Sequence, residues 1–173
     1  MMFVRITGAF AALLLASGIA CSQGKPTDPQ IAHIAYTAGV LDIEAAQQAL
    51  QKSTNKDVRA FATNMEQDHK AVNDKALALV KKLGVKPEDN DTSKALTKQA
   101  ADKREQLAKL SGAAFDKAYI DNEVAYHKVV NGALETTLIP DASNPELKDL
   151  LKTGLKIFQG HEQHAEHVAA ELK

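Results

Sequence analysis

Apolar residues recur every three or four positions over three long stretches of this chain, and histidines interrupt each of these stripes. The stripes cover residues 58–83, 120–138 and 147–172, and the histidines on them are His69, His127, His161 and His164. Alternating steps of three and four residues mark the inward face of a packed helix. The pattern therefore predicts several long helices that direct imidazole rings into a shared interior.

Turn and capping residues divide the chain into four long helices and one shorter, more polar one. Asp28 before Pro29 predicts a helix start, Gly84 predicts a helix end, and Asn144 predicts another start. The expected helices cover residues 29–52, 56–83, 93–110, 113–139 and 145–172. No segment has the alternating pattern of a strand. We expect an all-α, antiparallel four-helix bundle, with the additional short helix before the third long helix.

The first 20 residues have the features of a secretory signal peptide. Arg5 is followed by an apolar run, Ile6–Leu15, and then by small residues up to Ala20. The run is shorter than the roughly 20 residues that a membrane-spanning helix needs. We therefore expect a signal peptide at 1–20, a flexible tether at 21–28, and one helical domain at 29–173.

Cys21 is the only cysteine, and it directly follows the predicted signal peptide. An unpaired cysteine in an exported chain has two explanations here. Cys21 could carry a lipid as the new N-terminus of a bacterial lipoprotein, or it could be a free thiol in the tether after ordinary cleavage. Both remain open, and Cys21 is the candidate lipidation site.

The charge balance limits the classes of partner. The net charge is −1 over 173 residues, and the lysines are dispersed rather than clustered. A nucleic-acid partner is therefore not expected. Membrane association is expected only through Cys21, and the sequence defines no protein partner.

Carboxylates accompany the inward histidines at helical spacing. Glu66 precedes His69 by three residues, and Glu123 precedes His127 by four, so each pair shares one helix face. Divalent metal ions in helical bundles are bound by such imidazoles and carboxylates. The candidate metal ligands are Glu44, His69, His127 and His161, with Glu66, Glu123 and His164 as secondary candidates, and the candidate ions are Fe, Mn, Zn or Cu.

The positions of these residues along the bundle axis test whether they can lie close together. In an up-down-up-down bundle, the turns near Thr54 and Asp141 would lie at the same end. At about 1.5 Å per residue, Glu44 would lie about 15 Å from that end and His69 and His127 about 21 to 22 Å, with His161 deeper. The polar residues are therefore expected at similar heights along the bundle axis.

Several segments resemble a known family. They are LDIEAAQQAL at 41–50, the run through Asp68 and His69, GAAFDKAYIDNEVAYH ending at His127, and the helix with His161. Together, over about residues 29–171, they resemble the DUF4142 family of exported bacterial proteins, often described as predicted outer membrane proteins. The resemblance implies a ferritin-like bundle and a periplasmic or outer-membrane-associated location, and no established activity. The family's recurrent polar residues match Glu44, Asp68, His69, His127 and His161, which adds Asp68 to the secondary candidates.

Three functions are compatible with these features. The first is an exported cell-envelope protein that binds a divalent transition metal through inward His and Glu residues. The alternative is a non-catalytic structural or stress-related bundle, in which the histidines form a hydrogen-bonded polar layer without metal. A di-metal oxidase is the weakest of the three, because the last helix lacks the Glu-x-x-His motif. No catalytic residue is assigned.

Overall fold

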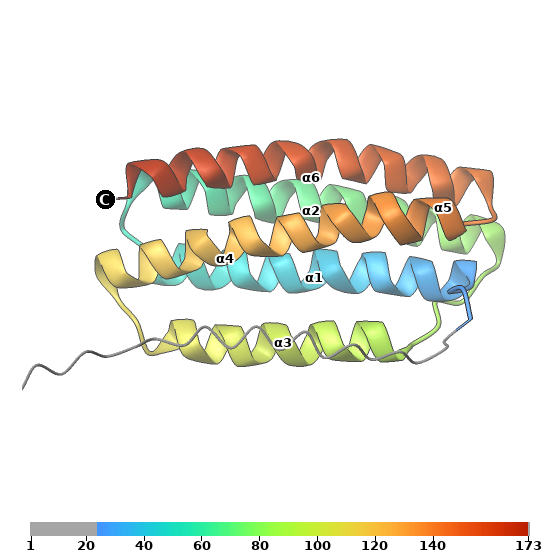
Figure 1. Ribbon diagram of the computed structural model, residues 1–173, viewed down its shortest axis with the longest axis horizontal. Coiled ribbons are helices and arrows are strands. Elements are labelled where there is room, and N and C mark those ends of the chain that lie inside the picture. The colour runs from blue at the N-terminus through green and yellow to red at the C-terminus, as the bar shows by residue number, and fades with distance from the viewer. Residues whose placement is uncertain (1–23, 173) are drawn as a thin grey trace, which may run out of the picture.

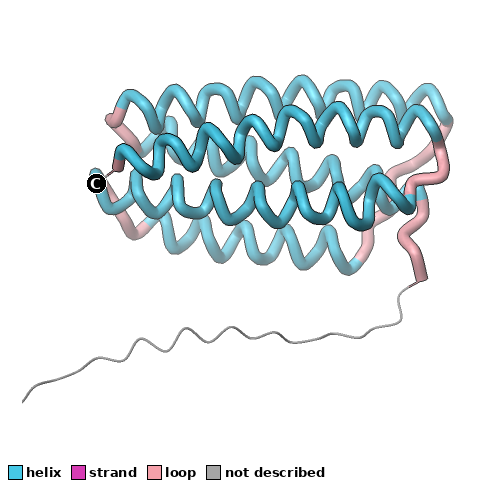
Figure 2. The backbone as a smooth tube through the Cα atoms, turned by 45° about the horizontal axis from the view of Figure 1, so that its top comes forward, coloured by secondary structure: helices cyan, strands magenta, loops and turns pink. Residues whose placement is uncertain are grey.

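The computed structural model describes residues 24–172, so the predicted signal peptide and Cys21 lie outside the described residues. All regular structure in this part of the chain is helical (Figure 2). Its elements are α1 (Asp28–Lys52), α2 (Lys56–Leu83), α3 (Asp91–Ala108), α4 (Gly112–Ala133), the π-helical turn η1 (Leu134–Leu138), α5 (Ile139–Asp141) and α6 (Pro145–Glu171).

Helices α1, α2, α4 and α6 form a four-helix bundle, and α3 lies outside it (Figure 1). The most extensive packing is between α1 and α2 and between α4 and α6, and α2 also packs against α6. Helix α3 packs mainly against α1. The predicted class, a ferritin-like antiparallel bundle with an additional helix before the third long one, is confirmed.

The connectivity differs from the up-down-up-down order that the sequence suggested. Helix α3 runs back along the outside of the bundle, so α4 runs parallel to α2 (Figure 1). The turn before α6 therefore lies beside the start of α1, where the Asp28 carboxylate accepts hydrogen bonds from the backbone N–H groups of Ser143 and Asn144 at 2.7 and 2.8 Å. The turns near Thr54 and Asp141 are thus at opposite ends of the bundle. One long crossover is a feature of ferritin-like folds.

This connectivity brings four polar residues to one level of the bundle. Helices α1 and α6 start at the end where α2 and α5 finish, so heights in all four helices can be measured from that end. At a rise of about 1.5 Å per residue, Asp42, His69 and His127 lie about 21 Å from it, and His161 lies about 24 Å from it. The four side chains therefore start from nearly the same height on four different helices.

The helix ends follow the predicted capping with one exception, and one predicted helix is interrupted. Gly84 adopts the left-handed conformation (φ 65°) after α2, and the Asn144 side chain caps α6, as predicted. The N-cap of α1 is Thr27 rather than Asp28, because the Asp28 carboxylate binds the turn before α6 instead. The predicted helix 113–139 is interrupted by the π-helical turn at 134–138, which no feature of the sequence indicated.

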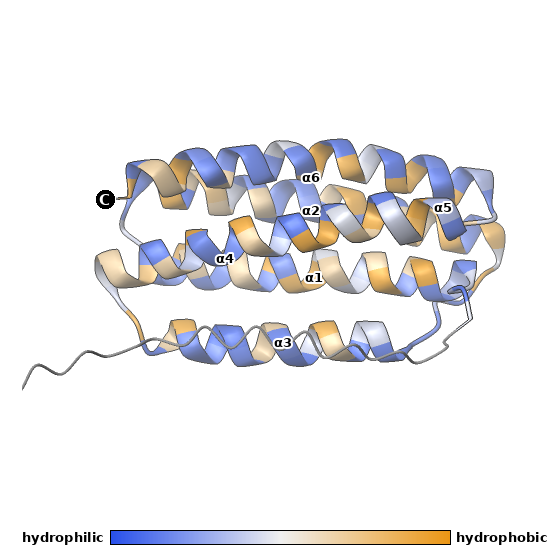
Figure 3. Cartoon of the chain, viewed as in Figure 1, coloured by the Kyte–Doolittle hydropathy of each residue, from blue (hydrophilic) through white to orange (hydrophobic). Residues whose placement is uncertain are grey.

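Two apolar clusters form the core, one at each end of the bundle. One contains Phe61, Met65, Phe115 and Tyr119, and the other contains residues of the opposite ends of the helices: Ile31, Ile34, Leu134, Leu138, Leu147 and Leu151. Apolar residues are thus concentrated on inward faces, while polar residues cover the outside (Figure 3). The buried polar residues near the middle of the helices separate these two clusters.

A close helix contact makes Gly39 sensitive to substitution. A Cβ atom on Gly39 would overlap the side-chain amide of Asn73, which is itself buried. Because the Asn73 amide must move to admit this atom, Gly39→Ala is expected to have a free energy of unfolding about 1 kcal/mol below that of Gly160→Ala, measured by urea denaturation. Gly160→Ala is the control, because it adds the same methyl group to α6 with no neighbouring atom within 4 Å. Equal stabilities of the two variants would contradict the packing described here.

Candidate metal centre

Three histidines from three helices converge in the middle of the bundle. His69 comes from α2, His127 from α4 and His161 from α6, and their exposed fractions are 3%, 1% and 6%. The ring centroids lie 5.2 to 5.8 Å apart in all three pairs. Each ring offers a nitrogen within 4.8 Å of a nitrogen of both others. The predicted convergence of these imidazoles is therefore present in the structure.

The fourth helix of the bundle contributes Asp42, a residue that the sequence reasoning missed. Its side chain is almost fully buried, and its Oδ2 lies 2.8 Å from His69 Nε2 and 3.4 Å from His127 Nε2. Asp42 also groups with Glu123 and His127, whose ligand atoms lie within 4.8 Å of one another. Each of the four bundle helices thus supplies at least one side chain of a type that can bind a metal ion.

Hydrogen bonds determine which nitrogen is free in two of the rings. His127 Nδ1 lies 2.9 Å from the backbone carbonyl oxygen of Glu123, and a carbonyl only accepts, so Nδ1 carries the proton. In the neutral ring, Nε2 then presents a lone pair. His161 Nε2 lies 3.0 Å from Asp68 Oδ2 and donates to this carboxylate, which leaves the lone pair on Nδ1. Hydrogen bonds of this kind, to the outer nitrogen, orient the histidine ligands of metal ions.

Several inner atoms of this cluster have no hydrogen-bond partner among the described residues. They are His127 Nε2, His161 Nδ1, both nitrogens of His69 and both carboxylate oxygens of Asp42. Asp42 Oδ2 and His69 Nε2 lie 2.8 Å apart, the distance of an ion pair, although the ring N–H is not well directed at the oxygen. Buried polar atoms without partners are costly, and such a concentration of them needs an explanation.

The burial of the cluster, together with the charges inside it, shifts the pKa values of its members in different directions. Burial raises the pKa of Glu123 well above its usual value, and the neighbouring Asp42 carboxylate adds to this effect. Burial opposes ionisation of Asp42 too, but the adjacent His69 and His127 outweigh it and hold the pKa of Asp42 below its usual value. Burial lowers the pKa of His127, and it lowers the pKa of His161 to about 4. At neutral pH these two rings are neutral and able to bind a metal.

The low pKa of His161 predicts an acid-sensitive contribution to stability in the metal-free protein. Between the usual value of 6.5 and about 4, the unfolded chain takes up a proton that folded His161 does not. Stability from this residue is therefore complete above pH 6.5 and is lost as the pH falls, by up to about 3 kcal/mol in total. Glu123, whose pKa is raised, acts in the opposite sense.

The contribution of His161 to the pH dependence of stability is isolated by comparing the unsubstituted protein with His161→Leu. Chemical denaturation of both chelator-treated proteins between pH 7.5 and 5 is expected to show a steeper loss of stability in the unsubstituted protein. Parallel pH profiles would contradict the assignment of a depressed pKa to His161.

The other predicted site residues lie around the cluster or away from it. Glu123 is buried beside His127, and Asp68 is half-exposed at the outer edge of His161. His164 packs edge-on against Phe61, with ring centroids 5.2 Å apart, and so lies in the neighbouring apolar cluster.

Two predicted carboxylates face away from the histidines. Glu44 forms an ion pair with Arg104 of α3, with its side chain 43% exposed. Glu66 accepts a hydrogen bond from Gln47 Nε2 at 2.9 Å. The carboxylate of α1 that faces the histidines is therefore that of Asp42 and not that of Glu44, because Asp42 lies on the inward face of the helix.

The fold and this cluster define a ferritin-like helical bundle with an internal group of histidines and carboxylates. The chain belongs to the DUF4142 family: the family model described as "Domain of unknown function (DUF4142)" matches residues 16–168. None of the curated proteins matches the chain significantly. Among the residues that the structure describes, no helix is both long and apolar enough to cross a membrane.

Two solved structures share the fold. One is a DUF305 fragment from Deinococcus radiodurans, with 13% sequence identity, a TM-score of 0.71, and coverage of 86% of this chain and 99% of that one. The other is described as "putative secreted protein DUF305" from Streptomyces coelicolor, with 11% identity, a TM-score of 0.70, and coverage of 83% and 91%. At these identities, the similarity establishes the fold alone.

Proposed function

We propose that this protein binds one divalent transition-metal ion through His69, His127, His161 and Asp42. The observation that carries the proposal is the arrangement of the unpartnered inner atoms. His127 and His161 each use one nitrogen for a hydrogen bond and leave the other buried without a partner; the three histidines offer nitrogens within 4.8 Å of one another, and Asp42 Oδ2 lies close to His69 and His127. A cation between the three rings, with the Asp42 carboxylate beside His69 and His127, would give these atoms a partner.

A hydrogen-bonded polar layer without metal explains the lack of hydrogen-bond partners for these inner atoms less well. In such a layer the imidazoles and carboxylates would satisfy one another, as buried polar groups usually do. Here His127 Nε2, the nitrogen left with a lone pair, lies 3.4 Å from Asp42 Oδ2, and neither atom has a hydrogen-bond partner among the described residues. Two electron-rich atoms repel each other unless a positive charge lies near both. A metal ion supplies that charge.

The donor set favours certain ions. Three imidazole nitrogens and one carboxylate oxygen suit Zn²⁺, Cu²⁺ and Fe²⁺ in tetrahedral or related geometries. The general order of affinity for such sites predicts tighter binding of Cu²⁺ than of Zn²⁺ or Fe²⁺, and weakest binding of Mn²⁺. Glu123, beside Asp42 and His127, is an additional oxygen donor once it loses its proton.

Metal analysis of protein purified without a histidine tag tests the proposal. After chelator treatment, the protein is titrated with Zn²⁺, Cu²⁺, Fe²⁺ or Mn²⁺ in isothermal calorimetry, and the bound ion is counted by elemental analysis. One ion per chain and a raised unfolding temperature are expected. Stoichiometry well below one for all four ions, or undiminished binding by a variant with leucine at His69, His127 and His161, would refute the proposal.

The hydrogen bond from Asp68 predicts a smaller effect at the edge of the site. Asp68→Ala removes the acceptor that fixes the His161 tautomer, and we expect Zn²⁺ affinity to fall about 10-fold. Asp74→Ala is the control, because Asp74 is an exposed aspartate of the same helix with no contact to the cluster. Equal affinities of the two variants would show that Asp68 does not orient the ligand.

We further propose that the protein works in the cell envelope. The predicted signal peptide at 1–20 supports this location, and the Streptomyces coelicolor neighbour is described as secreted. Cys21 would then carry a lipid or remain a free thiol. Mass spectrometry of the mature protein from fractionated bacterial cells distinguishes the two, because a lipid on Cys21 changes the mass of the N-terminal peptide. An unprocessed chain in the cytoplasm would refute export.

A further inference from the structure

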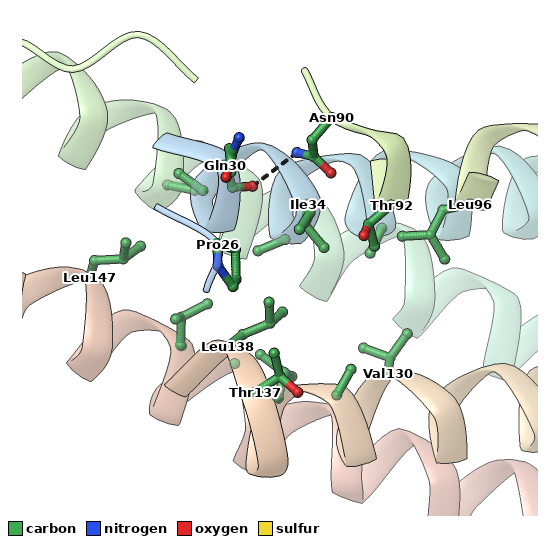
Figure 4. A pocket seen from close by; sticks show the side chains of 18 of the residues that line it. Pro26, Gln30, Ile34, Asn90, Thr92, Leu96, Val130, Thr137, Leu138 and Leu147 are labelled. Carbon is green, nitrogen blue, oxygen red and sulfur yellow. Dashed lines mark hydrogen bonds between the residues drawn. The ribbon is translucent and has the colours of Figure 1, made fainter. Parts of the chain in front are cut away.

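A second feature of the bundle lies beside the histidine cluster and is unrelated to metal binding. A cavity of about 860 Å³ opens between α1, α2, η1 and α6, with the start of α3 at its rim. Its volume is within the range of small-molecule sites, about 300 to 1,000 Å³. Figure 4 shows Ile34, Val130 and Leu138 around this space, with Thr92 and Leu96 of α3 at one side.

The cavity is elongated and mostly apolar. Its wall on α6 extends from Leu147 to Phe158, which is about 16 Å of helix, and its wall on α2 extends from Val72 to Val80, about 12 Å. Aliphatic side chains dominate these walls, whereas polar residues such as Gln30, Asn90 and Thr92 are at the rim (Figure 4). The space therefore suits a medium-length alkyl chain or a small ring system.

One buried polar side chain stands out in these apolar walls. Asn73 is only 6% exposed, lines the cavity, and forms no hydrogen bond within the part of the chain that the structure describes. Its amide has both a donor and an acceptor, and a buried amide usually has partners for both. Gly39 allows this amide to lie closely against α1, since any larger residue there would overlap it. The amide thus lies against α1 at the wall of the cavity, without a hydrogen bond to another described residue.

The charges around the cavity indicate a neutral ligand. Lys25 and Lys94 at the rim are already paired with Asp141 and Asp89, at 3.0 and 3.5 Å. No cation lies near Asn73 at the inner wall among the lining residues, and burying an unpaired carboxylate there would be costly. A hydroxyl, carbonyl or amide group would instead bond to the Asn73 amide without this cost.

We propose that this cavity binds a neutral molecule with a medium-length alkyl chain or a ring, whose single hydrogen-bonding group contacts Asn73. The inner wall includes Phe158, whose ring stacks on His69 at 4.5 Å between centroids. A bound molecule would therefore lie one aromatic ring away from the histidine cluster. The proposal is independent of metal binding, because none of the four proposed ligands lines the cavity.

Binding of three probes to the chelator-treated protein tests the proposal. The probes are 1-octanol, octanoate and toluene, measured by calorimetry and by shifts of the Asn73 side-chain amide signals in NMR spectra. Octanol is expected to bind at one site per chain and more tightly than octanoate at pH 8. Asn73→Leu is expected to weaken octanol about fivefold to 10-fold, the effect of one hydrogen bond, and to leave toluene binding equal or tighter.

Two variants, each with one alanine replaced by phenylalanine, locate the binding site. Ala35→Phe fills the cavity from α1 and is expected to abolish binding of octanol and toluene, whereas Ala60→Phe, on an exposed face of α2, is expected to leave both unchanged. Circular dichroism checks that both variants are folded. Three results would overturn the proposal: no binding of any probe, binding that survives Ala35→Phe in the folded variant, or tighter binding of octanoate that Asn73→Leu does not alter.

Discussion

Replacing His127 with leucine is expected to lower the affinity for Zn²⁺ at least about 100-fold, or about 2.7 kcal/mol. His127 is the residue that the two groups of potential ligands share. Its Nδ1 is held by the Glu123 carbonyl, so its Nε2 is aimed at Asp42 and cannot be replaced by a neighbouring ring. Leucine fills similar space without a lone pair. Calorimetric titration of the chelator-treated variant measures the loss.

The matched control is His167→Leu in α6. His167 is a histidine with a 71% exposed side chain, and its contact is with Glu171 on the outside of the bundle. This substitution removes an imidazole but leaves the cluster intact, so Zn²⁺ affinity should be unchanged. If both variants lose affinity equally, the ion binds at surface histidines rather than in the interior.

Phe61→Ala is expected to cause the largest loss of stability, about 3 to 5 kcal/mol. Phe61 is completely buried in the apolar cluster that includes Met65, and its ring packs edge-on against Tyr119 and His164. Truncation to alanine removes these contacts and leaves a cavity that helix packing does not close. Urea denaturation of the metal-free protein measures the effect.

Leu77→Ala is the control for this substitution. Leu77 is an apolar residue of the same helix, but it is 44% exposed, so its truncation should change stability by less than about 1 kcal/mol. A loss below about 1 kcal/mol in Phe61→Ala, or equal losses in both variants, would contradict the position of Phe61 in the core.

The histidines could be predicted from the sequence because each one replaces an apolar residue in an otherwise regular stripe. His69, His127 and His161 all lie inside the bundle at positions given by steps of three and four. This inference depends only on helix periodicity, which tertiary packing rarely alters in long helices. The helix ranges could be predicted for the same reason.

Asp42 was missed because only Glu44 was considered as the inward carboxylate of this helix. The buried side of α1 includes Ile31, Ile34 and Leu41, and it continues through Ala38, Asp42, Ala46 and Ala49. Alanines and an aspartate give a weak apolar signal, so position 42 did not stand out as inward. Applying the same step rule from Ile31 would have found Asp42.

The crossover by α3 could not be predicted from the sequence. Residues 93–110 are polar on most faces, and nothing in the loops on either side specifies that this segment runs along the outside of α1. The prediction that the polar residues lie at similar heights therefore rested on a wrong topology. The correct topology brings Asp42, His69 and His127 to a common level more closely than the assumed one.

X-ray absorption spectroscopy of the Zn²⁺-loaded protein tests metal binding by the histidine cluster most directly. The expected first shell has three imidazole nitrogens at about 2.0 to 2.1 Å and one carboxylate oxygen at about 2.0 to 2.2 Å. The multiple scattering of three imidazole rings should decrease by one ring in His161→Leu. A first shell of water oxygens with one imidazole or none would contradict binding of the ion inside the bundle.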